Sequence, residues 1–340
     1  MSSSLRNFLI TRALLTIPMV LILITMVFFI MRILPGDPIR SELGPKATEE
    51  QVEIIAERLG LNKPLYQQYY EFLWQMITLD FGNALTQGER PIIDELAEKL
   101  PATIELTIPA MLFTALFGIF AGAYAAKKRK KTQDYGIRLF SIAIYSIPIF
   151  VMGLIFQIIF SVRLNILPIA GRLDPLLLVT FESPTNFYII DSILTQNWAA
   201  LRSAIAHLIL PALTLGLALT GVFIRLTRVN MIEAQESDFI TAGRARGIPE
   251  NKLHYRHALR NTFIPILTLI GLQFAILLAG AVLTETTFSW PGMGRYLVTR
   301  IQLRDYNAVQ ATIGVFALFV AFISIVMDIL YAFIDPRIRY

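Results

Sequence analysis

Few side chains in the apolar parts of this chain could do chemistry. Four ionisable residues lie inside or beside long apolar runs, namely Glu105, His207, Glu285 and Asp328. Each lies near the end of its run, where a charged group reaches the membrane interface at low cost, so we expect structural roles for them. A proton-coupled transporter would instead place a carboxylate near the middle of a run.

The remaining polar residues make no catalytic constellation. The sequence has no cysteine, which excludes thiolate chemistry, disulfides and cysteine-ligated metal sites. Its three histidines are scattered along the chain. The phosphate-loop pattern GxxxxGKS/T and the hydrolase patterns HExxH and GxSxG do not occur. We therefore expect no enzyme active site, no metal and no cofactor on this chain.

The elements that would position any functional residue are membrane helices. Of the 340 residues, 55% are hydrophobic and 16% are charged, which is too apolar for a soluble domain of this size. A helix needs about 20 apolar residues to cross the hydrocarbon. Six runs come near this length or exceed it, at 13–31, 106–126, 139–162, 203–224, 261–284 and 307–327. The expected fold class is an all-α polytopic membrane protein with six transmembrane helices.

The orientation follows from the basic residues. With the N-terminus inside, 17 basic and 6 acidic residues fall in the inner segments, at 1–12, 127–138, 225–260 and 335–340. The outer segments, at 32–100, 163–202 and 295–305, hold 13 basic and 16 acidic residues. Both termini are therefore expected in the cytoplasm. The net charge of +5 reflects this topology, and we expect no nucleic-acid partner.

Amphipathic patterns in the outer segments predict short helices on the outer face of the membrane. Thr48 and Gln51 form a capping-box start, with one apolar face at Val52, Ile55, Ala56 and Leu59. A second helix is expected over PLYQQYYEFLWQMITLD, with an apolar face at Leu65 or Tyr66, Tyr69, Leu73 and Met76. The outer loop 163–202 contains FYIIDSILTQNWAAL, which could form one short helix, and SWPGMGRYL near 289–297 predicts a turn before the sixth transmembrane helix.

The inner segment before the fifth run carries a compact polar sequence, DFITAGRARGIPE at 238–250. Asp238 can cap a short helix, and small residues keep one face thin enough for another surface to approach, at Ala242, Gly243 and Ala245. Gly247 can end that helix in a left-handed conformation, and Pro249 suits the start of the next. The pattern predicts two short helices that dock on a partner protein. A basic loop that only sets topology is the simpler alternative.

Several stretches resemble the permease subunits of binding-protein-dependent ABC importers, specifically the dipeptide and oligopeptide type. They are LPGDP at 34–38, LGLNKPLYQQYYEF at 59–72, LPATIEL at 100–106, LILPALTLGL at 208–217, SDFITAGRARGIPENKLHYRHALRNTFIPILT at 237–268, ETTFSWPGMGRYLV at 285–298, RDYNAVQ at 304–310 and DILYAFIDPRIR at 328–339. The resemblance covers essentially the whole chain and implies the type I importer permease fold.

In that family, the loop between the fourth and fifth helices is a coupling helix that docks on the ATP-binding subunit. The resemblance implies this role for Asp238, Thr241, Ala242, Gly243, Arg244, Ala245, Arg246 and Gly247. Thr241, Ala242 and Gly243 stand where other importers have glutamate and two alanines. The downstream FIP at 263–265 is also spaced differently from the general motif. The two arginines are candidates for charged contacts with the ATP-binding subunit.

The resemblance also implies the partners and further candidate sites. The partners are a homologous second permease, two ATP-binding subunits that hold ATP and magnesium, an external substrate-binding protein and membrane lipid, in a prokaryotic cell membrane. The loop at 289–295 and segments around 163–202 are candidates for the outer gate or binding-protein contacts, including Trp290, Pro291, Gly292, Gly294 and Arg295. Residue type alone suggests translocation-path residues at Ser141, Ser146, Gln157 and Gln273.

We divide the chain into an N-terminal tail with the first helix (1–34), an extracytoplasmic helical segment (35–100) and a core permease domain (101–340). The core includes the coupling loop 230–260 and the outer loop 163–202. Peptides are the expected cargo, and nickel chelates, glutathione or oligosaccharides are alternatives. A stand-alone secondary transporter would show an internal repeat and broken mid-membrane helices. No repeat is evident, although Pro148 and Gly153 could break the third helix.

Overall fold

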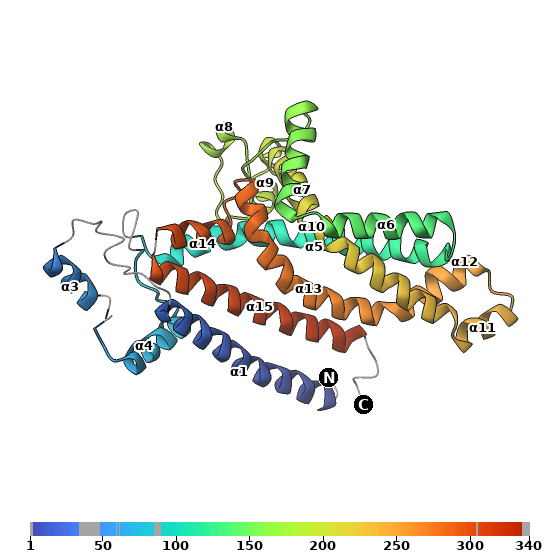
Figure 1. The fold of residues 1–340 in the computed structure, drawn as a ribbon, viewed down its shortest axis with the longest axis horizontal. Helices are drawn as coiled ribbons and strands as arrows, with labels where there is room; N and C mark the ends of the chain where they lie inside the picture. The colour runs from blue at the N-terminus through green and yellow to red at the C-terminus, as the bar shows by residue number, and fades with distance from the viewer. Residues whose placement is uncertain are drawn as a thin grey trace.

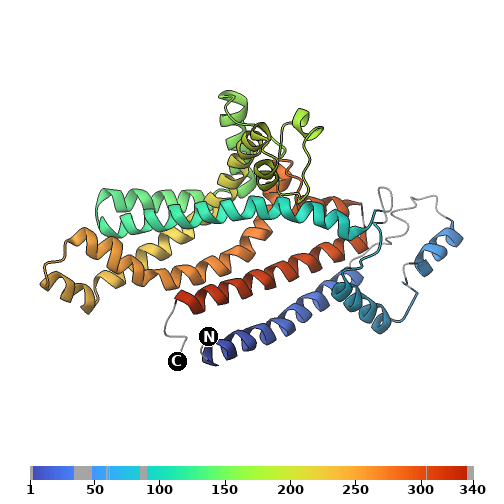
Figure 2. The same cartoon turned by 180° about the vertical axis from the view of Figure 1, so that it is seen from behind.

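The structure is a computed structural model that describes residues 3–33, 48–58, 60, 62–84, 90–303 and 305–334. Within these ranges the regular structure is helical, apart from one isolated bridge between Asn83 and Pro91. Long helices run alongside one another, with α3, α4 and α14 at one end and α11 and α12 at the other (Figure 1). Segments α7 to α9 project sideways from the middle of this bundle (Figures 1 and 2).

Five of the six predicted apolar runs lie within single long helices: α1 (Ser3–Ile33), α5 (Ile92–Lys127), α10 (Trp198–Gln235), α13 (Leu259–Thr287) and α15 (Tyr306–Ile334). Four stretches are long and apolar enough to cross a membrane, in α5, in α10, across 250–278 and in α15. The apolar stretch described in α1, Leu14–Ile30, is shorter. The all-α membrane class is confirmed, and the count of six spans remains a prediction consistent with these helices.

The third predicted helix, at 139–162, is not a single straight helix. It is divided into α6 (Thr132–Ser146), α7 (Ile149–Phe156) and the π-helix η1 (Gln157–Arg163). The axis bends by 101° between α6 and the second piece. Pro148 precedes α7 and has no N–H to continue the hydrogen-bond ladder of α6, so the suspected break occurs there. The pair counts as a fifth span if both pieces cross together.

Small residues let α5 and α10 pack unusually closely in the centre of the bundle. A β-carbon on Gly118 would lie 2.3 Å from the side chain of Phe223, and one on Gly216 would lie 2.8 Å from the carbonyl oxygen of Ala110. The hydroxyl of Thr114 donates to the carbonyl of Gly216 at 2.7 Å. Close backbone approach is the usual way in which membrane helices gain packing energy, since lipid supplies no hydrophobic drive between them.

The outer helices differ in detail from the sequence prediction. Helices α3 (Glu49–Arg58) and α4 (Leu65–Thr78) form where expected, but the buried face of α4 consists of Gln68, Phe72 and Met76. Leu65 or Tyr66 was predicted on that face, and both are exposed. The side chains of Ile55 and Leu59, the motif at 34–38, Arg304 and residues 335–340 lie outside the described residues.

The two outer loops contain more helix than predicted. FYIIDSILTQNWAAL is not one helix, because α9 (Tyr188–Leu194) ends and α10 begins at Trp198, where the Asn197 side chain accepts the N–H of Ala200 at 3.0 Å. A single turn, α8 (Pro175–Leu178), precedes α9. After the predicted SWPG turn the chain forms α14 (Met293–Gln302) before α15.

Candidate functional site

The end of the bundle opposite α4 carries the projection predicted from DFITAGRARGIPE (Figure 1). It consists of α11 (Asp238–Ala245), α12 (Glu250–Lys252) and the π-helix η2 (Leu253–Ala258), which continues directly into α13. Figure 1 shows α11 as the element furthest from α4 along the bundle. Asp238 was predicted to cap α11, which is wrong in detail, because the N-cap position is Ser237 and no side chain caps the helix. Asp238 lies in the first turn, where a negative charge favours the helix dipole.

Gly247 ends α11 as predicted. Its φ of 73° is in the left-handed region. The N–H of Gly247 donates to the carbonyl of Arg244 at 2.9 Å, and the N–H of Ile248 donates to that of Gly243 at 3.1 Å. These two bonds make a Schellman motif, which pairs carbonyls that the helix end would leave free.

The small residues of α11 face two directions. Gly243 is buried against η2, where a β-carbon would lie 2.6 Å from the Leu253 side chain. Its role is therefore close packing within this chain. Ala242 and Ala245 are exposed, as are Thr241 and the 43% exposed ring of Phe239. The exposed surface of α11 thus includes one aromatic side chain among small residues.

The projection is joined to the C-terminal end of α5. The Nε2 atom of His254 in η2 is buried and lies 2.9 Å from the carbonyl oxygen of Ala123, within hydrogen-bond distance. The Nζ atom of Lys127 donates to Asn251 at 2.6 Å. Arg129, in the basic turn after α5, pairs with Glu236 just before α11. Polar contacts from both sides of α11 therefore join the projection to α5 and to the turn after it.

The two arginines of α11 and its C-terminal turn are in different situations. Arg244 pairs with Glu250 at 2.6 Å, and this hydrogen bond raises the pKa of its guanidinium. Both side chains are exposed, so the pair contributes little to stability. Arg246 is exposed and has no ion-pair partner in the part of the chain that the structure describes. A contact of either arginine with an ATP-binding subunit stays a prediction.

At the end of the bundle opposite α11, Glu285 organises the loop between α13 and α14. Its buried carboxylate accepts the hydroxyl of Thr103 at 2.6 Å and the backbone N–H of Arg295 at 2.9 Å. It therefore caps the first turn of α14 from outside the helix. Gly292 leaves room for it, since a β-carbon there would lie 2.2 Å from a carboxylate oxygen. The expected structural role of Glu285 agrees with these contacts.

Trp290 and the outer loop 163–202 are fixed to α5 beside this cap. The indole N–H of Trp290 donates to the carbonyl of Ala102 at 2.9 Å, and the ring is 1% exposed. Glu105 pairs with buried Arg172 of the outer loop, whose guanidinium lies 3.8 Å from the ring centre of Tyr188. The sequence could not pair Glu105 with Arg172, because either could have faced solvent.

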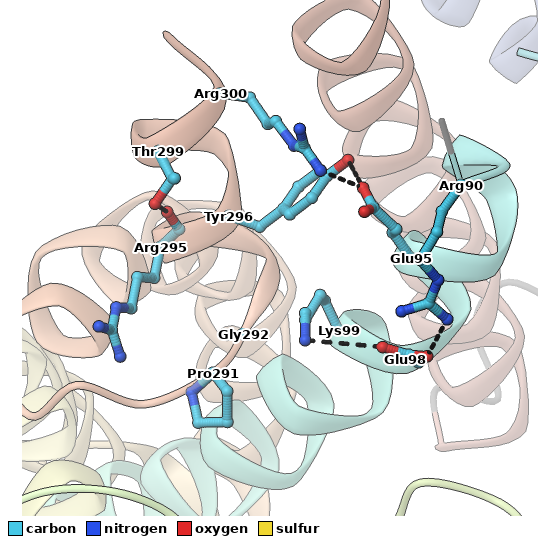
Figure 3. Close-up of a pocket in the computed structure, with 10 residues that line it drawn as sticks. All are labelled: Arg90, Glu95, Glu98, Lys99, Pro291, Gly292, Arg295, Tyr296, Thr299 and Arg300. Carbon is cyan, nitrogen blue, oxygen red and sulfur yellow. Dashed lines mark hydrogen bonds and ion pairs between the residues drawn. The ribbon is translucent and has the colours of Figure 1, made fainter. Parts of the chain in front are cut away.

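A polar cavity of about 360 Å³ lies between the start of α5 and α14. Figure 3 shows Tyr296 and Arg300 directed at the carboxylate of Glu95, each 2.5 Å from the same oxygen. Burial and the hydrogen bond to Glu95 raise the pKa of Tyr296 above its usual range. Arg300 also lies 3.3 Å from Asp305 at the start of α15. This cluster, which the sequence prediction missed, ties the beginning of α5 to α14 and α15.

Of the residues predicted for outer contacts, some are enclosed. Trp290, Gly292 and Gly294 are buried, Pro291 is half-buried and Arg295 is exposed. Of these five residues, Arg295 and one edge of Pro291 are open to solvent. A gating role for the loop stays a prediction.

The four predicted path residues are not brought together. Ser141 donates to the carbonyl of Gly221 at 2.9 Å, and Gln157 donates to the carbonyl of Ile169 at 2.8 Å, so both join elements of the bundle. Gln273 is buried and its side-chain oxygen has no hydrogen-bond partner among the described residues. Ser146 is exposed at the end of α6. The roles of all four in a translocation path remain predictions.

Comparison with known proteins gives the family. Residues 118–340 match the binding-protein-dependent transport system inner membrane component, and residues 5–107 match the N-terminal part of such membrane components. The chain belongs to this family of transport-system membrane components. The predicted resemblance to importer permeases is thus confirmed.

Individual family members are similar over nearly the full length. The di/tripeptide transport system permease protein DppB of Pseudomonas aeruginosa is 44% identical over 314 residues, which covers 92% of this chain and 93% of that protein. The dipeptide permease DppB of Alkalihalophilus pseudofirmus is 40% identical over 97% of this chain and 98% of its own length. The glutathione transport system permease GsiC of Escherichia coli K12 is 36% identical over 98% of this chain and 99% of its own length.

Proposed function

We propose that this chain is the membrane-spanning permease subunit of an ATP-driven importer that carries di- and oligopeptides delivered by an external binding protein. The observation that carries the proposal is the helical projection α11 to η2, which exposes Phe239 at one end of an apolar bundle. The chain is similar throughout to a di- and tripeptide permease. Glutathione is the alternative cargo that a relative supports, and nickel chelates or oligosaccharides are further alternatives.

The proposed assembly contains a homologous second permease and two ATP-binding subunits, which hold ATP and magnesium. The distribution of basic residues supports an orientation with α11 and both termini in the cytoplasm and with α4 and α14 outside. ATP-driven closure of the ATP-binding subunits would then push α11. The contacts of His254 and Lys127 would transmit this movement to α5, which reaches the outer loop through Ala102 and Thr103.

The docking face is tested by replacing the exposed aromatic side chain. A buried aromatic anchor is worth about 2 kcal/mol or more in an interface, so Phe239→Glu should weaken binding of the ATP-binding subunits by about 30-fold or more. The measurement is recovery of those subunits with the tagged permease from membranes. Leu176→Glu is the matched control, because Leu176 is 83% exposed and lies in the outer loop. Equal recovery with both variants would remove α11 as the docking element.

Cargo is tested by uptake into vesicles that contain the whole transporter and its binding protein. Radiolabelled dipeptides should accumulate only with ATP and both ATP-binding subunits. Uptake that persists without those subunits would instead support a stand-alone secondary transporter, and preference for glutathione would reassign the cargo.

A further inference from the structure

The break between α6 and α7 leaves backbone groups without partners. The carbonyl oxygens of residues 145–147 receive no hydrogen bond from the part of the chain that the structure describes. The N–H groups of residues 149–151, in the first turn of α7, likewise have no acceptor among the described residues. Only the N–H of Met152 resumes the ladder, with a bond of 3.1 Å to the carbonyl of Pro148. The break therefore offers acceptors and donors side by side.

This break lies at membrane depth. Ser146 is about 21 Å along the helix axis from Thr132, where α6 starts, while the hydrocarbon is about 30 Å thick. The basic turn at 127–131 directly precedes α6 and marks the inner surface. The end of α6 also packs on α10, a candidate span, where a β-carbon on Gly221 would lie 3.4 Å from the Tyr145 side chain.

The lipid around the bundle cannot satisfy these groups, and no described residue of this chain does so. Lipid tails offer no hydrogen bonds, so unpaired backbone at this depth occurs only where protein or a water-filled cavity covers it. An apolar helix of a second permease would bring side chains alone, because its own N–H and carbonyl groups are used internally. Polar side chains also lie at the break: Tyr145 is 63% exposed, and exposed Ser146 donates to Ile142 at 2.9 Å, which leaves its oxygen free to accept.

We propose that the break between α6 and α7 is a cargo-binding site on the translocation path, where the free backbone groups of residues 145–147 and 149–151 hydrogen-bond to the backbone of a passing peptide. The hydroxyls of Tyr145 and Ser146 add two further partners. A peptide backbone presents N–H and carbonyl groups in alternation, so it matches a site with both kinds of group. Recognition through the backbone is independent of the peptide's side chains. The inference rests on the proposed peptide-import function.

Water accessibility at the break provides the first test. The chain has no cysteine, so Ser146→Cys gives a single thiol on this chain. Leu112→Cys is the matched control, because Leu112 is 57% exposed on unbroken α5 and lies about 22 Å from the inner end of that helix. Both variants are assembled into the whole transporter in vesicles with ATP. A charged, water-soluble thiosulfonate should modify the Ser146→Cys variant at least about tenfold faster, since the reactive thiolate requires water.

Protection by cargo tests the ligand. A saturating tripeptide, delivered with the binding protein, should slow modification of the Ser146→Cys variant. The same tripeptide methylated at its backbone nitrogens should protect less at equal occupancy of the binding protein. Modification no faster than in the Leu112→Cys variant, or equal protection by both peptides, overturns the site.

A second variant avoids the thiol. Tyr145→Phe with Ser146→Ala should raise the half-saturating concentration for peptide uptake about two- to tenfold, the usual effect of lost hydrogen bonds. Ser324→Ala is its control, because the hydroxyl of Ser324 also donates to a carbonyl four residues earlier at 2.9 Å. An unchanged half-saturating concentration in the double variant contradicts the site. If the Ser146→Cys variant takes up peptide normally but its thiol is not accessible to water, this inference alone is overturned. If the unmodified transporter takes up no peptide, the proposed function itself is overturned.

Discussion

Gly247 ends the coupling projection through its backbone conformation alone. A β-carbon at this position would meet nothing within 4 Å, so a larger side chain would cause no collision in this chain. A residue other than glycine at a φ of 73° nevertheless costs about 1–2 kcal/mol. The bonds from Gly247 and Ile248 to α11 hold only in this conformation. Gly247→Val should therefore lower the equilibrium constant of the native turn, relative to other conformations, by about 5- to 30-fold.

The predicted consequence is uncoupling. If the turn sets the angle at which α11 meets the ATP-binding subunits, Gly247→Val should lower peptide uptake per ATP hydrolysed by a similar factor, while the permease still inserts in the membrane. The assay measures uptake and phosphate release in the same vesicles. Gly247→Asn is the control, because asparagine adopts the left-handed conformation more readily than valine and should stay near normal. Normal coupling in the Gly247→Val variant would refute the reasoning. An equal loss of coupling in both variants would also refute it, because side-chain size and not backbone conformation would then be the cause.

Three further predictions concern stability and placement. Replacing Arg172 by Met should leave the Glu105 carboxylate buried without its ion-pair partner and lower the free energy of unfolding by about 3–5 kcal/mol. The purified complex should then have a lower Tm. An unchanged Tm would mean that water already reaches the pair. Gly292→Ala should displace the carboxylate cap of α14 and lower the Tm, whereas Gly136→Ala should not, because a β-carbon there meets nothing within 4 Å. The fluorescence of Trp74, which is exposed on α4, should be quenched more by lipids brominated near the headgroup than by lipids brominated at the chain ends. The reverse order would place α4 deeper than the membrane interface.

Features carried by short stretches of sequence were predicted well. Apolar runs of helical length identified the membrane class, because the requirement to satisfy backbone groups in lipid leaves few other structures. The turn at Gly247 was predictable because a left-handed helix end depends on one residue and its neighbours. The suspected break at Pro148 has the same local origin, since proline removes its own N–H wherever it occurs.

The sequence by itself thus determined the membrane class, the end of α11 at Gly247 and the position of the projection. The tertiary structure alone decided which partners lie across the fold: Arg300 reaches Glu95 over a separation of 205 residues, and Arg172 reaches Glu105 over 67. It also decided that Gly243 faces its own chain, and that the helix before Pro148 turns by 101°. The physical reason is that periodicity and turn residues act on neighbouring backbone, whereas burial of a charge or the direction of a helix depends on what packs against it from elsewhere in the chain.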